Sequence, residues 1–165
     1  MSSDPSSEPA PILMQPIGRV LNSRLQVQDD HWGGLISRIV IDLGAAALQG
    51  LEEFSHAGII FYFDRVEASQ AERGARRPRG SPAWPQVGIL AQRAKGRPNR
   101  LGLTIVKILK REGNILTVSG LDAVDGSPVL DIKPVMREFL PEGPLRQPAW
   151  VEELMQDYWK EPQEK

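Results

Sequence analysis

The chain has 165 residues, of which 41% are hydrophobic and 25% are charged, and its formal net charge is −1. This composition predicts one compact soluble domain and restricts any nucleic-acid surface to a local patch. The absence of cysteine excludes disulfides, thiolate zinc sites and cysteine nucleophiles, and two histidines are too few for a multi-histidine metal centre.

The N-terminal segment is rich in serine, proline and acidic residues. Residues 1–14 are therefore expected to form a disordered leader, because such residues cannot bury enough apolar surface to offset the entropy of ordering. The segment lacks the basic and then apolar pattern of a secretory signal, and no apolar run reaches the roughly 20 residues that span a bilayer. A cytoplasmic location is expected.

Short apolar runs separated by turn residues predict a protein made mainly of strands. A loose helical turn is expected over residues 50–56, and residues 111–114 predict the turn of a hairpin. No alternation of strands with helices is present, so the pattern favours an antiparallel β-barrel or a strongly curved sheet. The expected strands cover residues 16–20, 35–43, 58–63, 87–92, 101–109 and 115–118.

Two long loops carry a concentration of arginines. The first covers residues 68–85 and the second covers residues 93–100. Guanidinium groups suit phosphates and carboxylates because they offer several donors in one plane. The loops are therefore candidate phosphate-binding surfaces, with a simple solvated loop as the alternative. The arginines of the first loop are Arg73, Arg76, Arg77 and Arg79.

Residues 120–134 combine three aspartates with a tight turn and are the most distinctive part of the chain. Gly126 allows the turn after Asp125, and Pro128 restricts the backbone that follows. Asp122 and Asp125 flank two apolar residues, so a local turn is expected to bring both carboxylates to one pocket rim. A hairpin turn with solvated acids is the alternative interpretation.

A proline-rich connector over residues 141–148 precedes a change of periodicity. Residues 149–160 predict an amphipathic helix, because its apolar residues recur at helical spacing. That stripe consists of Val151, Leu154, Met155 and Tyr158. Trp150 and Trp159 lie off it and would contact either a partner chain or a loop. The expected organisation is a leader over 1–14, a barrel domain over 15–140 and a C-terminal connector with its helix over 141–165.

Several enzyme classes are excluded by missing motifs. The chain has no G-x-G-x-x-G after a strand and no G-x-x-x-x-G-K-[ST], which argues against a Rossmann or P-loop nucleotide site. It also lacks the G-x-S-x-G elbow of α/β-hydrolases.

Three segments, in this order and spacing, resemble the TsaA/TrmO family of S-adenosylmethionine-dependent tRNA methyltransferases. They are residues 50–61, residues 97–103 and residues 120–134, and the resemblance covers approximately residues 16–134. It implies a mainly β fold: a compact single-sheet antiparallel β-barrel (TsaA-like) with a C-terminal helix and long basic loops. It also implies a homodimer with S-adenosylmethionine bound near the subunit interface.

The resemblance implies methylation of N6 of the threonylcarbamoylated adenosine beside the tRNA anticodon. The methyl donor is an activated sulfonium, so the enzyme would chiefly hold the acceptor nitrogen, methyl carbon and sulfur in line and exclude water. Two other classes stay open: a barrel that binds the cofactor as a sensor without catalysis, and an RNA-binding barrel without a cofactor. A methyltransferase with a different acceptor is a further alternative.

The resemblance also implies the site residues. Arg97 and Asn99 are predicted to position the substrate or to act in catalysis, and no metal is expected. The chain departs from the family pattern on the acceptor side, at residues 30–34, Asp64, residues 94–95 and Arg100. The cofactor-binding set is Arg65, Arg93, Leu103 and the turn Asp125, Gly126, Ser127 and Pro128, which is similar to the family's Asp-Gly-Thr-Pro segment.

Overall fold

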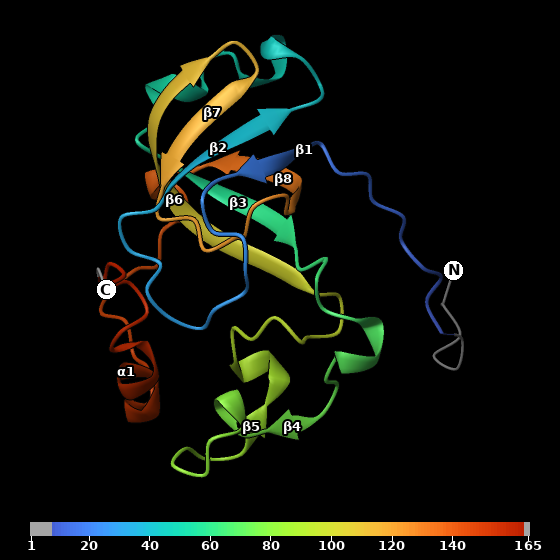
Figure 1. Cartoon of the computed structure of the whole chain (residues 1–165), viewed down its shortest axis with the longest axis vertical. Helices are drawn as coiled ribbons and strands as arrows, with labels where there is room; N and C mark the ends of the chain where they lie inside the picture. The colour runs from blue at the N-terminus through green and yellow to red at the C-terminus, as the bar shows by residue number, and fades with distance from the viewer. Residues whose placement is uncertain (1–7, 164–165) are drawn as a thin grey trace.

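A closed antiparallel barrel forms the body of the protein (Figure 1). The structure is a computed structural model that describes residues 8–163. Within that range the barrel strands follow the order β1-β2-β7-β6-β3-β8, so the predicted mainly β barrel is confirmed. The strands are β1 (Gly18–Leu21), β2 (Ile36–Ile41), β3 (His56–Tyr62), β6 (Leu101–Glu112), β7 (Ile115–Ser119) and β8 (Pro128–Pro134).

Alternation of side chains along the strands separates the barrel interior from its outer face. On β6 the even-numbered residues Gly102, Thr104 and Val106 are buried, whereas Leu103 and Ile105 between them are exposed. This period of two is what a strand with one buried face requires. The outer face of β6 therefore exposes apolar side chains at these two positions.

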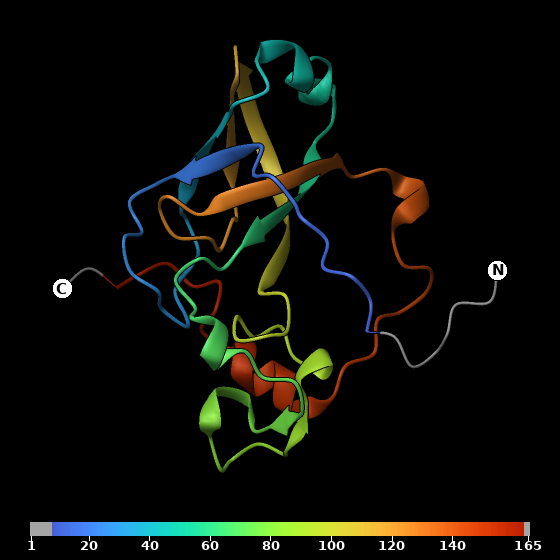
Figure 2. The same ribbon diagram turned by 90° about the vertical axis from the view of Figure 1, so that its right-hand side faces the viewer.

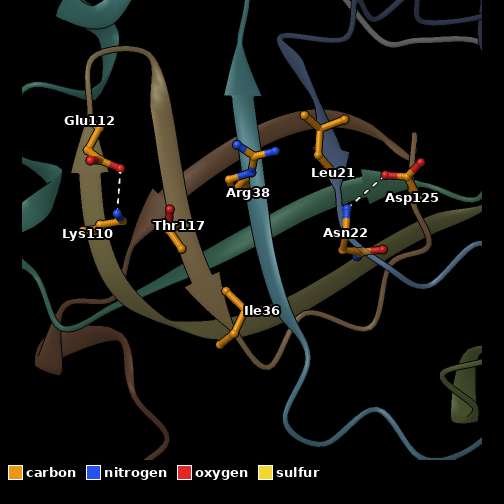
Figure 3. Close-up of a pocket in the computed structure, with 8 residues that line it drawn as sticks. All are labelled: Leu21, Asn22, Ile36, Arg38, Lys110, Glu112, Thr117 and Asp125. Atoms are coloured by element: carbon orange, nitrogen blue, oxygen red, sulfur yellow. Dashed lines mark hydrogen bonds and ion pairs between the residues drawn. The ribbon is translucent and has the colours of Figure 1, made fainter.

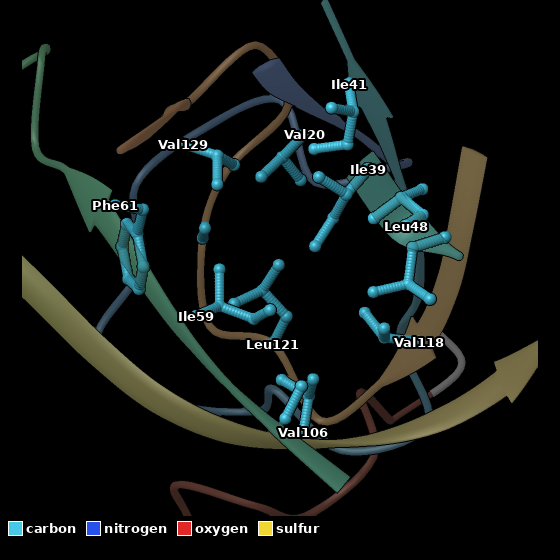
Figure 4. Close-up of a cluster of buried hydrophobic side chains, with 13 residues drawn as sticks. Val20, Ile39, Ile41, Leu48, Ile59, Phe61, Val106, Val118, Leu121 and Val129 are labelled. Carbon is cyan, nitrogen blue, oxygen red and sulfur yellow. The ribbon is translucent and has the colours of Figure 1, made fainter. Parts of the chain in front are cut away.

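Aliphatic side chains fill the interior of the barrel (Figure 4). The largest fully buried side chain is Phe61, whose ring lies over Gly102 on the neighbouring strand and meets Phe63 edge-on at 5.2 Å between ring centroids. A barrel this small is packed with its own side chains, so a ligand site has to be sought on the outside or at the ends. The core includes Val20, Ile39, Ile41, Ile59, Val106, Leu116, Val118, Leu121 and Val129.

The first basic loop is more ordered than its sequence suggests. Residues 87–92 were expected to form a strand, but only β5 (Val87–Gly88) is extended, and it pairs with β4 (Ala75–Arg76) in a small separate sheet. A 3-10 turn, η5 (Ile89–Ala91), follows at once. The prediction was wrong because this segment pairs within the loop: the Ile89 N–H donates to Gly74, and the Gln92 amide to Val87.

The C-terminal helix is shorter than its periodicity predicted. It is α1 (Ala149–Met155), whereas the stripe indicated residues 149–160. After Met155 the main chain turns away and pairs with residues 31–33, so tertiary hydrogen bonds replace helical ones. The other short helical turns are η1 (Ala45–Leu48), η2 (Leu51–Glu53), η3 (Ala68–Gln70), η4 (Pro78–Gly80) and η6 (Arg137–Phe139), of which η2 confirms the turn predicted over residues 50–56.

A view turned by 90° shows α1 beside the basic loop at the end of the molecule away from the β6–β7 hairpin (Figure 2). The chain leading into β1 is exposed over residues 8–16. The predicted leader falls partly outside the described residues, at positions 1–7, and the domain boundaries stay predictions. Over residues 8–163 no helix has the length and apolar character needed to cross a membrane.

Candidate functional site

The turn at residues 125–128 is held firmly against the end of β1. Gly126 has a φ of +81°, a conformation that glycine adopts without strain. The Asp125 N–H donates to the Arg24 carbonyl at 2.8 Å, and the Gly126 N–H donates to the Val20 carbonyl at 2.7 Å. Inside the turn, the buried Ser127 hydroxyl donates to the Val124 carbonyl at 2.7 Å. Ser127 therefore maintains the turn, while Asp125 and Gly126 form its surface.

Arg65 and Asp125, both predicted cofactor residues, are brought together by this turn. Asp125 Oδ1 accepts the main-chain N–H of Asn22 at 2.9 Å, which leaves Oδ2 without a partner among the described residues. The Arg65 guanidinium donates to the carbonyl of Asp125 at 2.9 Å and also to that of Leu25. Asn22 and Leu25 were not anticipated, since their contacts are made by the main chain.

Asp125 borders an open hollow of about 570 Å³ that is lined by residues of β1, β2, β6 and β7 (Figure 3). Its size is within the range of small-molecule sites. Arg38 and the half-exposed Ile36 project from β2 toward it. The lining thus offers an apolar surface together with charges of both signs, and it is completed by Leu21, Asn22, Lys110, Glu112 and Thr117.

A second pair of predicted cofactor residues meets on β6. The Arg93 guanidinium donates to the main-chain oxygen of Leu103, and the Leu103 side chain is exposed on the outer face. In the barrel, β3 separates β6 from β8. The predicted residues therefore form two groups, Arg65 with the turn and Arg93 with Leu103.

Arg97 and Asn99 are placed differently from one another. Arg97 is half-buried, and its guanidinium donates to the Gln92 carbonyl at 2.7 Å, so it maintains the second basic loop. Asn99 is exposed at the tip of that loop. Arg100 has a φ of +50° and stacks over the Tyr62 ring at 4.9 Å. Within the described residues, no hydrogen bond links Arg97 or Asn99 to the turn.

Several arginines of the first basic loop are engaged inside the protein. Arg79 forms a two-pronged ion pair with Asp30, at 2.7 and 2.9 Å, and this hydrogen bonding raises the pKa of Arg79. Arg77 donates to the Trp84 carbonyl at 2.5 Å, and Arg76 is half-buried. Arg73 is exposed. The loop consequently offers fewer free guanidinium groups to phosphates than its sequence suggested.

The sequence predicted that Asp122 and Asp125 would lie at one pocket rim, but only Asp125 borders the hollow. Its Oδ1 accepts the Thr104 hydroxyl at 2.5 Å, and its Oδ2 accepts the hydroxyl of Tyr158. Tyr158 was assigned to the apolar stripe of the helix, and nothing in the sequence signalled this polar contact. Burial, followed by the negative charge and hydrogen bonding of Asp122, raises the pKa of Tyr158 far above its usual value of 10.

The Tyr158 hydroxyl makes stability depend on pH under alkaline conditions. The positive charges of Arg93 and Arg79 oppose the rise in pKa but do not cancel it. The folded-state pKa exceeds the unfolded one, so the contribution is complete below about pH 10 and decreases as pH rises toward the folded-state pKa. Between pH 10 and 11 the free energy of unfolding should fall by about 1 kcal/mol more in the wild type than in Tyr158→Phe.

Urea denaturation of the two proteins at both pH values measures this difference. Parallel losses of stability in wild type and Tyr158→Phe would contradict the assignment.

Among residues 8–163, no three histidine, aspartate or glutamate side chains are grouped to hold a metal ion.

Comparison with known proteins places this geometry in context. The family model described as tRNA-methyltransferase O N-terminal domain matches residues 28–139. A mouse protein named tRNA (adenine(37)-N6)-methyltransferase is 41% identical over 93 residues, which cover 56% of this chain and 21% of that protein. A probable S-adenosyl-L-methionine-binding protein of Pyrococcus abyssi is 37% identical over 97 residues, covering 56% of this chain and 47% of that protein.

The fold is also that of solved relatives. A crystal structure of TrmO from Pseudomonas aeruginosa superposes with a TM-score of 0.69 and 25% identity, covering 87% of this chain and 63% of that one. The chain spans about a fifth of the mouse relative and about half of the Pyrococcus one. The family model covers more than half of the chain, and the barrel agrees with the solved structures. The resemblance noted in the sequence is therefore confirmed, and the chain belongs to the family defined by the tRNA-methyltransferase O N-terminal domain.

Proposed function

We propose that the protein is an S-adenosylmethionine-dependent methyltransferase that acts on N6 of an adenosine in tRNA, the threonylcarbamoylated adenosine beside the anticodon. Family membership and the names of the relatives support this reaction. The observation that carries the proposal is the turn at residues 125–128. It is similar to the family's Asp-Gly-Thr-Pro cofactor segment, and Asp125 borders a hollow of small-molecule size.

The residues present fit an adenosyl sulfonium. When bound, the cofactor supplies an activated methyl group, and the protein must orient it and exclude water. Asp125, whose Oδ2 has no partner within residues 8–163, gives the hollow a carboxylate that favours a cation. Arg65 ties the main chain of Asp125 to that of Leu25, because its guanidinium donates to both carbonyls. Arg93 and Leu103 supply the second group of cofactor contacts, and Asn99 is exposed to meet the acceptor.

The test is calorimetric titration with S-adenosylmethionine, followed by methyl transfer to tRNA with and without the threonylcarbamoyl group. Saturable binding and transfer only to the modified tRNA would establish the function. Binding without transfer to either tRNA would favour the sensor. Transfer to a different acceptor would keep the enzyme and change its substrate. Failure to bind the cofactor would rule out both the methyltransferase and the sensor.

We also propose a homodimer in which the outer face of β6 meets a second copy. Leu103, Ile105 and Leu109 are 52%, 56% and 45% exposed on this strand, and an apolar row of this kind is suited to an interface. Leu103 belongs to both this face and the predicted cofactor set, which supports a cofactor site near the interface.

Replacing Ile105 by lysine should convert the dimer to a monomer, because a charge would be buried at the centre of the apolar row. Sedimentation equilibrium measures the change in mass. Arg19→Ala serves as the control, because it removes an exposed charge from β1, a strand that does not neighbour β6 in the barrel. A wild type that sediments as a monomer at high concentration would contradict the dimer.

A further inference from the structure

The C-terminal segment, residues 149–163, is built onto the barrel although the family model ends at residue 139. Its main chain accepts three hydrogen bonds from the loop before β2: from His31 to Asp157 at 3.1 Å, from Trp32 to Tyr158 at 2.8 Å, and from Gly33 to Lys160 at 3.1 Å. A Cβ at Gly33 would overlap the Trp159 carbonyl. The two segments therefore fit together closely.

This docking carries the Tyr158 hydroxyl to the carboxylate of Asp122. Asp122 in turn accepts the hydroxyl of Thr104, which follows Leu103 on β6. Three residues after Asp122 comes Asp125, and the two residues between them are buried. Asp122 thus connects β6, which carries Leu103, to the turn at residues 125–128.

The charge of Arg93, which donates to the Leu103 carbonyl, acts on the Tyr158 hydroxyl. One side chain from outside the residues that the family model matches is therefore linked through Asp122 to Thr104, the neighbour of Leu103, and to the loop that carries the turn.

We propose that Tyr158 is a positioning residue of the cofactor site, so that the C-terminal segment completes a site that the family domain alone leaves loose. The proposal rests on the proposed cofactor function. Without the Tyr158 hydroxyl, one oxygen of the half-buried Asp122 carboxylate would lose its partner. The loop over residues 122–127 would then be free to seek another arrangement, because buried polar atoms do not stay unpaired without cost. A supporting shell of this kind determines how accurately ligand-binding groups are held.

The test compares Tyr158→Phe with Glu153→Met in the full-length protein. The first removes only the hydroxyl that reaches Asp122. The second removes the acceptor of the Trp84 indole N–H, a contact at 2.9 Å that anchors the same C-terminal segment but does not reach the turn. Tyr158→Phe should raise the dissociation constant for S-adenosylmethionine at least tenfold, and Glu153→Met should leave it within about twofold of the wild type.

Hydrogen exchange of the Asp125 and Gly126 amides gives a readout that needs no ligand. Both amides are hydrogen-bonded in the folded turn, and Tyr158→Phe should lower their protection at least tenfold, while Glu153→Met should not. Equal binding by Tyr158→Phe and wild type would overturn the proposal and leave the function intact. Equal losses in both variants would also overturn it, since the segment would then act only as general support. A wild type that fails to bind the cofactor would refute the proposed function and this role of Tyr158 with it.

Discussion

Replacing Asp125 by alanine is expected to weaken S-adenosylmethionine binding about a hundredfold. The substitution removes the carboxylate at the edge of the hollow and also the acceptor for the Asn22 N–H. The first loss removes attraction for a cation, and the second loosens the turn that carries Gly126. Each of these losses is expected to reduce the binding free energy by about 1–3 kcal/mol, and about 1.4 kcal/mol corresponds to a tenfold change in affinity. Calorimetric titration at constant ionic strength measures the result.

Asparagine at position 125 separates charge from turn geometry. Its amide oxygen can still accept the Asn22 N–H, so the melting temperature should stay within about two degrees of the wild type, as expected for surface changes. Affinity for S-adenosylmethionine should nevertheless fall about tenfold, whereas affinity for S-adenosylhomocysteine, which lacks the sulfonium charge, should change less. Equal losses for the two ligands would show that Asp125 does not act on the sulfonium. An unchanged affinity of Asp125→Ala for S-adenosylmethionine would show that the turn is not part of the cofactor site.

The barrel could be predicted because the burial of each strand is visible in its local sequence, as an alternation of apolar and polar residues. On β6, alternation of exposed and buried residues follows from one face being packed in the core. The β6–β7 hairpin follows from the turn residues between two such runs. The strand expected over residues 87–92 failed because apolar residues alone do not specify a pairing partner. Its buried Ile89 packs within the basic loop, and its Leu90 is 79% exposed.

The candidate site could be predicted only in part, because contacts between residues far apart in the sequence leave no local pattern. The resemblance gave Arg65, Arg93, Leu103 and the turn as one cofactor-binding set, and the structure divides it into two contacting groups, Arg65 with the turn and Arg93 with Leu103. No local pattern could pair Tyr158 with Asp122, since 36 residues separate them and helical periodicity records only burial. The ion pair of Arg79 with Asp30 likewise spans 49 residues. These long-range polar contacts decide which charges remain free for a ligand.

Replacing Phe61 by alanine is expected to cost about 3–5 kcal/mol of unfolding free energy, because it removes the largest fully buried side chain from the barrel. The ring also covers Gly102, its direct partner on β6, which has no side chain to fill the space. The total free energy of unfolding of such domains is only about 5–15 kcal/mol. Urea denaturation followed by circular dichroism should therefore show a large fall in the midpoint or a protein unfolded at room temperature.

Phe61→Leu is the matched control, since leucine keeps a large apolar side chain over Gly102 and should cost clearly less than alanine. A loss below about 1 kcal/mol in Phe61→Ala would contradict the packing described for this strand. The effect should extend to the site, because Phe61 and Phe63 pack against each other on the segment that leads to Arg65. In whatever fraction of Phe61→Ala remains folded, the Arg65 contact with Asp125 should be loosened. Its S-adenosylmethionine affinity should consequently fall more than in Phe61→Leu, even at temperatures where both variants are folded.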